Sequence, residues 1–170
     1  GYRVPGVTGG ARRCGVTGGR VGGMAGPEIV DRAAGDLRSH ASGNGSSGSQ
    51  SAALEAVAGD LTDVMAMREA LDRRRVAMSG LLRQIDGLEL LEPQGAFYAY
   101  PDMSALLGRE IVGRTAATTN ELAGIILEEA KVAIVPGEAF GTPGYARLSF
   151  ALGDDDLREG LTRMVDLLNG

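Results

Sequence analysis

The sequence predicts an α+β (α/β) fold, in which helices pack on a small, mostly antiparallel sheet. Three observations lead to this prediction. A long helical pattern of apolar residues occupies 61–85, and another helix is expected over 119–130. Short β-rich runs at 132–135 and 145–150, with Pro and Gly between them, are typical of neighbouring strands. With 170 residues, the chain is long enough to bury a core.

The glycine content divides the chain near residue 50. The first 50 residues hold 14 of the 27 glycines, and glycine raises the entropy cost of ordering a segment. Residues 1–50 are therefore expected to be loop-rich or poorly ordered unless something packs on them. Residues 51–170 have the composition of an ordinary globular domain, and the two ranges are the predicted domains.

Each expected element follows from a local pattern. Apolar residues three or four apart indicate helices, and short β-rich runs bounded by turn residues indicate strands. In chain order, the sequence predicts helix 51–58, helix 61–85, strand 87–91, strand 96–100, helix 119–130, strand 132–135, strand 145–150 and a last helix from Asp154 onward.

The last predicted helix is strongly amphipathic. Asp154 is expected to cap its N-terminus, while Asp155 and Asp156 favour the positive end of the helix dipole. The stripe that should face the core consists of Leu157, Leu161, Met164, Val165 and Leu168.

The charge balance excludes one class of partner. Seventeen basic and 22 acidic residues give a formal net charge of −5, whereas nucleic-acid-binding domains carry a basic stripe. The run Arg73, Arg74 and Arg75 is the exception, and its place in the helical pattern predicts the solvated face of that helix. We expect no nucleic-acid partner.

Cysteine, histidine and hydropathy limit the chemistry further. Cys14 is the only cysteine and His40 the only histidine, so neither an intrachain disulfide nor a zinc site is expected. No apolar run approaches the roughly 20 residues that cross a bilayer. We therefore expect no membrane association and a cytoplasmic location.

Arg147 is the main candidate functional residue. It lies within 132–151, a segment otherwise built to be buried. A guanidinium is costly to bury unpaired, and its planar fork of N–H donors suits a carboxylate. The local pattern alone equally allows an arginine on a half-exposed strand that reaches water or pairs with an internal Asp or Glu.

Four ordered blocks extend over most of the chain. Residues 17–27 contain Thr-Gly-Gly-Arg-Val-Gly and Ala-Gly-Pro, 39–54 form the second block, and 93–101 read Pro-Gln-Gly-Ala-Phe-Tyr-Ala-Tyr-Pro. The fourth is the segment that carries Arg147. Together these blocks resemble the C-terminal part of the class I aminotransferases, the pyridoxal-phosphate enzymes of fold type I. They are most similar to bacterial aspartate aminotransferases.

The resemblance implies a domain organisation and a reaction. Residues 51–170 would form the small C-terminal domain with its connecting long helix, and 1–50 a remnant of the large cofactor-binding domain. The full-length protein would transfer an amino group between L-aspartate and 2-oxoglutarate, as a homodimer with pyridoxal 5'-phosphate. Its small-molecule partners would be amino acid and 2-oxo acid carboxylates.

The resemblance also assigns roles to three arginines. Arg20 takes the place of the arginine that contacts the cofactor phosphate, and Arg147 that of the arginine that binds the substrate α-carboxylate. Arg12 occupies the position of the Schiff-base lysine, and arginine can neither form the Schiff base nor act as a base near neutrality. The only lysine, Lys131, falls at the end of helix 119–130, where a cation favours the helix C-terminus.

No catalytic residue of the family is therefore intact, and we expect this chain not to transaminate alone or to hold the cofactor covalently. The family's aspartate, asparagine and tyrosine around the cofactor ring lie upstream of these residues. Gly19 and Gly23 replace aromatic residues, and Gly45 and Gly48 replace β-branched ones, so apolar packing area is lost. Whether the chain is an enzyme in its own right stays open at this level.

Four alternatives remain. The chain can be a non-catalytic fragment or pseudoenzyme with only a folding or dimer-contact role, or a partner chain can supply the missing lysine. The parent protein can catalyse a lyase reaction, since related lyases share the arginine and lysine positions. A nucleotide-binding loop at 15–22 is the fourth, but no convincing strand precedes it and no Gly-Lys-Ser/Thr ending follows.

Overall fold

The structure, a computed structural model, describes residues 6–9 and 17–170. The chain forms two compact units, Gly1–Met67 and Arg68–Gly170. The two units meet between Met67 and Arg68. The domain boundary expected after residue 50 stays a prediction. All the buried apolar side chains of the described residues belong to the second unit.

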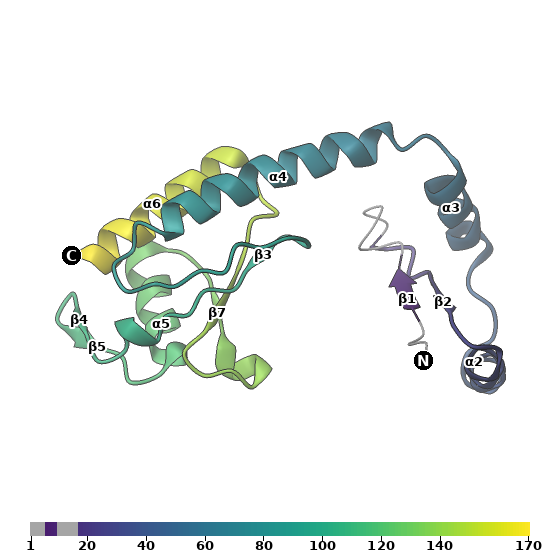
Figure 1. Ribbon diagram of the computed structural model, residues 1–170, viewed down its shortest axis with the longest axis horizontal. Coiled ribbons are helices and arrows are strands. Elements are labelled where there is room, and N and C mark those ends of the chain that lie inside the picture. The colour runs from purple at the N-terminus through teal and green to yellow at the C-terminus, as the bar shows by residue number, and fades with distance from the viewer. Residues whose placement is uncertain (1–5, 10–16) are drawn as a thin grey trace. The chain divides into compact units, whose positions relative to one another are not determined.

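A small antiparallel sheet lies at the centre of the second unit (Figure 1). Its order is β3 (Tyr98–Ala99), β7 (Ala146–Ser149), β6 (Val135–Pro136), with both pairings antiparallel. In this register Ala99 lies opposite Leu148, and Val135 opposite Arg147. The predicted α+β fold with a mostly antiparallel sheet is therefore confirmed.

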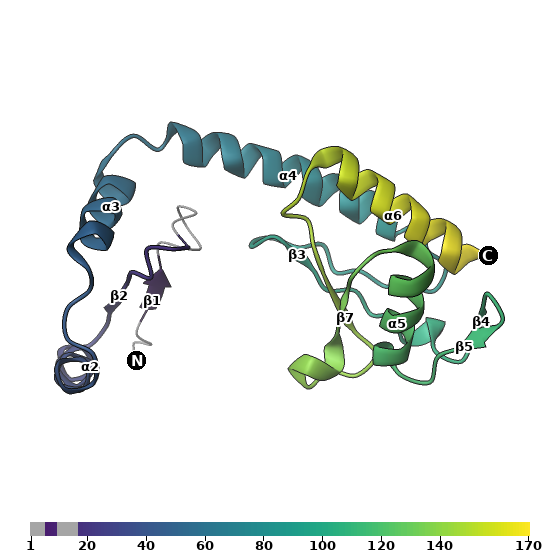
Figure 2. The same cartoon turned by 180° about the vertical axis from the view of Figure 1, so that it is seen from behind.

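Three helices supply most of the core. They are α4 (Thr62–Leu82), α5 (Thr119–Ala130) and α6 (Asp154–Asn169). Figures 1 and 2 both show α6 beside the C-terminal half of α4, and α5 packs against α6. The core includes Met78, Leu82, Ile126, Leu148 and Phe150. The predicted helix 119–130 is confirmed, and Thr118 caps it by accepting a hydrogen bond from the Glu121 N–H.

The apolar stripe of α6 is also confirmed, but its cap is not. Leu157, Leu161, Met164 and Leu168 are buried, and Val165 packs partly buried against them. The N-cap residue is Gly153, without a side-chain cap, so the prediction that Asp154 caps the helix was wrong. The Asp154 carboxylate turns instead toward α4 and pairs with Arg74 and Arg73.

The same ion pairs correct the prediction of a fully solvated arginine face on α4. Arg73 is largely exposed, but the side chains of Arg74 and Arg75 retain only 24% and 23% of their exposure. Arg75 pairs with Asp72 and Glu92. These arginines therefore link α4 to its neighbours, since Arg74 pairs with Asp154 of α6 and Arg75 pairs with Glu92.

The strands are shorter than predicted. Residues 87–91 form no strand, since only Glu89 makes an isolated bridge, with Asp102. The runs at 96–100 and 145–150 shorten to β3 and β7, and of 132–135 only Val135 is paired in β6. β6 ends at Pro136, which lacks an N–H, and the 3₁₀ helix η2 (Gly137–Phe140) begins at the next residue.

Two small elements had no sequence prediction. They are the 3₁₀ helix η1 (Ser104–Leu106) and a hairpin of β4 (Glu110–Ile111) with β5 (Arg114–Thr115). Val112 and Gly113 in the hairpin turn both have positive φ, 50° and 72°. That is the backbone signature of a tight two-residue hairpin turn.

The described part of the first unit contains an antiparallel pair, β1 (Gly6–Gly9) with β2 (Gly22–Ala25), and two helices. The sequence reasoning missed α2 (Glu28–Ala41), and α3 (Ser47–Ala58) begins before the predicted residue 51. The Ser46 side chain accepts a hydrogen bond from the Ser49 N–H and so caps α3 earlier. Neither helix contains a buried residue.

Candidate functional site

Arg147 lies on the central strand of the sheet, on the face turned away from the core. Along β7, Ala146 and Leu148 are buried, Arg147 is half-buried and Ser149 is exposed. Because successive side chains of a strand point to opposite faces, the buried pair faces the core and Arg147 faces outward. Pairing with β3 and β6 on both edges fixes the backbone that carries the guanidinium.

Two aromatic rings cover this guanidinium. Arg147 Cζ lies over the Tyr98 ring and over the Phe140 ring, 4.6 Å from each centroid. The two rings come from different elements: Tyr98 belongs to β3, which pairs with one edge of β7, and Phe140 belongs to η2, which follows β6 on the other edge. A cation–π contact contributes about 0.5–1 kcal/mol at an exposed site. We call Tyr98 and Phe140 the aromatic cover.

The N–H groups of Arg147 have no partner within residues 6–9 and 17–170. No carboxylate there forms an ion pair with it, and no acceptor there receives a hydrogen bond from it. The pairing with an internal Asp or Glu that the sequence left open is thus not seen among these residues. The N–H donors of Arg147 are therefore available to an acceptor, and their planar fork suits a carboxylate.

The loop between η2 and β7 fixes the position of Phe140. The Gly137 N–H donates to the Tyr145 carbonyl at 2.6 Å, and the Thr142 N–H donates to the Gly137 carbonyl at 3.0 Å. The Tyr100 hydroxyl hydrogen-bonds to Thr142 Oγ1 at 2.5 Å. Tyr100 also stacks on Tyr145 and meets the Phe140 ring edge-on, with centroids 5.4 and 6.2 Å apart.

The N-terminus of α5 holds both ends of this loop. Thr119 is fully buried, and its Oγ1 accepts a hydrogen bond from the Gly144 N–H at 2.9 Å. Its own N–H donates to Glu138 Oε1 at 2.9 Å. A carboxylate is favoured at this end of a helix. Glu138 Oε2 is buried and accepts no hydrogen bond within the described residues.

One tyrosine near the site is held neutral. Hydrogen bonds from Ser104, through its side chain and its backbone N–H, keep the pKa of Asp102 below its ordinary 3.8. The charge of Asp102, together with a hydrogen bond to it, raises the pKa of Tyr145 above 10.0. Tyr145 therefore contributes a neutral ring to the cluster near Arg147 at physiological pH.

The sequence pattern identified Arg147 but not the residues that surround it. Tyr98 and Phe140 lie in two of the quoted blocks, far apart along the chain, and no periodicity links either to Arg147. Glu138 and Thr119 are joined by a single hydrogen bond between a loop and a helix. The only sequence signal was the concentration of aromatic residues in the segments 93–101 and 132–151, the second of which carries Arg147.

The predicted cofactor residues belong to the first unit. Arg12 lies outside the described residues. Arg20 is exposed, has a φ of 45°, and makes no hydrogen bond or ion pair within the described part of the chain. A positive φ is uncommon for a residue other than glycine, and such conformations cluster at functional sites. Its guanidinium is thus available to an anion.

Lys131 occupies the structural position that the sequence predicted. It ends α5 in the left-handed conformation, and its Nζ donates to the Glu128 carbonyl at 2.6 Å. A cation at this end of a helix binds carbonyls that lack helical partners. The amine is therefore engaged in capping α5.

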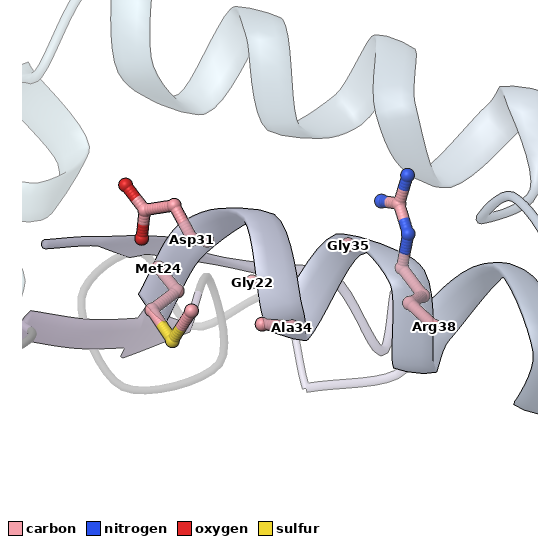
Figure 3. Close-up of a pocket in the computed structure, with 7 residues that line it drawn as sticks. Gly22, Met24, Asp31, Ala34, Gly35 and Arg38 are labelled. Atoms are coloured by element: carbon pink, nitrogen blue, oxygen red, sulfur yellow. The ribbon is translucent and has the colours of Figure 1, made fainter. Parts of the chain in front are cut away.

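A hollow in the first unit lies between β2 and α2 (Figure 3). Figure 3 shows Asp31 and Arg38 rising from the same side of α2, with Met24 near Asp31. Asp31 Oδ2 accepts a hydrogen bond from the Gly26 N–H at 3.2 Å. The rest of the lining is glycine and alanine, so the hollow brings no catalytic group together.

Two other classes of site are absent from the described residues. None of their His, Cys, Asp and Glu side chains gather in threes around a position for a metal ion. None of the helices in this part of the chain combines the length and apolar character needed to cross a membrane.

The family model for aminotransferase class I and II matches residues 6–164. The chain belongs to this aminotransferase family. Its similarity to aspartate aminotransferases is high: the protein of that name from Streptomyces avermitilis is 57% identical over 163 residues, which is 96% of this chain and 40% of that protein. The aspartate aminotransferase of Geobacillus stearothermophilus is 39% identical over 88% of this chain and 37% of its own length.

Solved aminotransferase structures show the same fold. The aspartate aminotransferase from Rhizobium meliloti superposes with a TM-score of 0.90 at 32% identity, over 99% of this chain and 42% of that one. An aromatic aminotransferase from Pyrococcus horikoshii gives a TM-score of 0.85 at 30% identity, over 97% and 43%. This aminotransferase chain thus spans about 40% of the length of the relatives it matches.

Proposed function

We propose that the chain is the C-terminal part of a pyridoxal-phosphate-dependent aspartate aminotransferase, in which Arg147 binds the α-carboxylate of the amino acid. The observation that carries this proposal is the Arg147 guanidinium, which is covered by two rings and has no partner for its N–H edge among the described residues. The full-length reaction would be amino-group transfer between L-aspartate and 2-oxoglutarate. The family and the names of its relatives support this choice.

The chain's own residues do not fit a covalently held cofactor. Bound pyridoxal phosphate supplies an electron sink for bonds at the substrate α-carbon, and the family attaches it to a lysine. Arg12 stands at that position, and the one lysine of the sequence, Lys131, caps α5. We therefore propose that this chain does not transaminate alone. Arg20 would contribute only a contact to the cofactor phosphate.

The domain and partner proposals follow from the same family membership. Residues 51–170 would be the small domain, and 1–50 a remnant of the large domain. The full-length protein would act as a homodimer in the cytoplasm on amino acid and 2-oxo acid carboxylates. A companion subunit would then have to bring the lysine that this chain lacks.

A second function has one observation in its favour. The only lysine side chain is committed to a helix end, which supports a non-catalytic fragment or pseudoenzyme with a folding or dimer-contact role. Treatment with pyridoxal phosphate and borohydride tests the non-catalytic proposal. It predicts no site-specific adduct on the chain, with Lys131→Arg as the control for surface labelling. A site-specific adduct would contradict it.

The carboxylate-binding role of Arg147 can be measured on the 170-residue chain. Succinate is titrated at constant ionic strength while the Arg147 Nε–Hε signal is followed by NMR. The Arg147→Ala variant is followed through neighbouring backbone amides. We expect it to lower succinate affinity at least about tenfold, because charge-assisted hydrogen bonds are lost. Arg147→Lys, which keeps the charge but not the fork, should fall between the two.

Arg114→Ala is the matched control, because Arg114 is exposed and already paired with Glu128 and Glu129 in the same unit. It should leave succinate binding unchanged. Equal succinate affinity in the parent chain and Arg147→Ala would remove the proposed role of Arg147.

A further inference from the structure

The aromatic cover constrains the approach of any ligand to Arg147. Arg147 Cζ is equally distant, 4.6 Å, from the centroids of the Tyr98 and Phe140 rings, and the elements that carry the rings lie on opposite edges of β7. A ligand oxygen cannot occupy the places that the two rings fill beside Cζ, so it must reach the N–H groups elsewhere. The N–H groups lie in the guanidinium plane, and both oxygens of a carboxylate can lie in it too.

The two rings are positioned independently of one another. Tyr98 belongs to β3, pairs with Ser149 of β7, and contacts the Phe97 ring at 4.5 Å between centroids. Phe140 is half-exposed and belongs to η2, and its place depends on the loop fixed by Thr142 and Tyr100. Because different elements hold the two rings, each can be altered while the other keeps its place.

Arg147, with its two ring contacts, differs from an exposed arginine that contacts no ring. A free arginine can turn its fork in several directions and binds phosphate and sulfate as readily as carboxylate. Contact with two aromatic rings limits the orientations of the guanidinium, and a side chain that is already ordered loses less entropy when it binds. The two apolar rings also disfavour charged oxygens placed against them, because such oxygens would lose water without gaining a donor.

We propose that Tyr98 and Phe140 are specificity-determining residues that make Arg147 selective for flat carboxylates over tetrahedral oxyanions. The inference rests on the proposed carboxylate-binding role of Arg147 and adds the reason for its selectivity. The rings act through Arg147, as positioning residues, by limiting the orientations of its guanidinium and by excluding ligand oxygens from the places that they occupy. They make no hydrogen bond to the ligand themselves.

The test compares two dianions, succinate and sulfate, on the 170-residue chain by the same NMR titration. The variants Tyr98→Leu and Phe140→Leu each remove one ring but keep an apolar side chain. Each is expected to lower the preference for succinate over sulfate by about two- to tenfold, because the loss of one ring lets water reach the sulfate oxygens that gain no donor. Tyr98→Phe and Phe140→Tyr keep a ring and should retain the preference of the parent chain.

A second readout separates positioning from general stability. The ¹⁵N relaxation of Arg147 Nε should show a more mobile side chain in each leucine variant and not in the ring-preserving ones. If either leucine variant does not fold, as judged by circular dichroism, the other ring still provides the test. Phe140 is half-exposed, so its leucine variant is expected to fold.

The outcomes distinguish this inference from the proposed function. If succinate binding depends on Arg147 but the succinate-to-sulfate ratio is unchanged in the folded leucine variants, the specificity role is overturned and the carboxylate role stands. If Arg147→Ala binds succinate as the parent chain does, both proposals fail together.

Discussion

Gly137 occupies a position where no side chain fits. A Cβ built there would lie 2.1 Å from the Thr142 carbonyl oxygen and 2.7 Å from that of Tyr145. Both are backbone atoms of the loop that positions Phe140, and the Gly137 N–H already donates to the second of them. The sequence marked this residue only as part of a Pro-Gly turn, whereas its role is to let two segments of backbone approach closely.

Gly137→Ala should therefore lower the free energy of unfolding by about 1–3 kcal/mol or more, because a backbone contact cannot be relieved by a rotamer change. Gly124→Ala is the matched control. Gly124 lies within α5, and a Cβ there meets nothing within 4 Å. The free energy of unfolding of this variant should rise by about 0.5–1 kcal/mol, because alanine loses less backbone entropy than glycine when the helix forms. Urea unfolding measures both, and equal effects would contradict the close approach at Gly137.

At the scale of elements, α6 is tied to α4 through a carboxylate at its first turn. A hydrogen bond from Arg74 and the nearby charges of Arg74 and Arg73 hold the pKa of Asp154 below its ordinary 3.8. A carboxylate whose pKa is lower in the folded than in the unfolded chain stabilises the fold at pH values above its unfolded-state pKa. That contribution is lost as the pH falls through its folded-state pKa.

Asp154→Asn should consequently melt at a lower temperature than the parent chain above about pH 4, and the difference should shrink as the pH is lowered further. Asp155→Asn is the control, because Asp155 lies in the same helical turn but forms no ion pair with the described residues. Melting curves between acidic and neutral pH test this. A pH-independent difference between Asp154→Asn and the parent chain would rule out the charge as its source.

The helices of the second unit could be predicted from the sequence, but the surroundings of the site could not. The stripe of α6 and the bounds of α5 follow from periodicity and from an N-cap threonine, which are local signals. The predicted cap of α6 was wrong because the Asp154 carboxylate pairs with an arginine of α4. The aromatic cover joins β3, η2 and β7, and such contacts depend on tertiary packing that no local pattern encodes.

At the scale of the whole molecule, burial is unevenly divided. The buried apolar residues of the described chain run from Met78 to Leu168, whereas α2 and α3 contain none. Helices without a buried face are only marginally stable in water. The first unit therefore has the secondary structure of its relatives but little of the packing that would stabilise it.

Hydrogen exchange followed by mass spectrometry should show this division. Amides of α5 and α6 are expected to exchange slowly, in step with global unfolding, while those of α2 and α3 should exchange within the first time points. The turn of the β4–β5 hairpin, where Val112 is 65% exposed, serves as an internal control for fast exchange in the second unit. Comparable protection of α2 and α5 would contradict the expectation.

The aromatic cluster also determines the intrinsic fluorescence of the chain. The sequence has four tyrosines and no tryptophan, and Tyr98, Tyr100 and Tyr145 are three of the four. Tyr98 contacts Arg147, and the other two stack on one another within the same cluster. The ultraviolet emission of the unlabelled protein thus originates chiefly from the face around Arg147, with no indole to mask it.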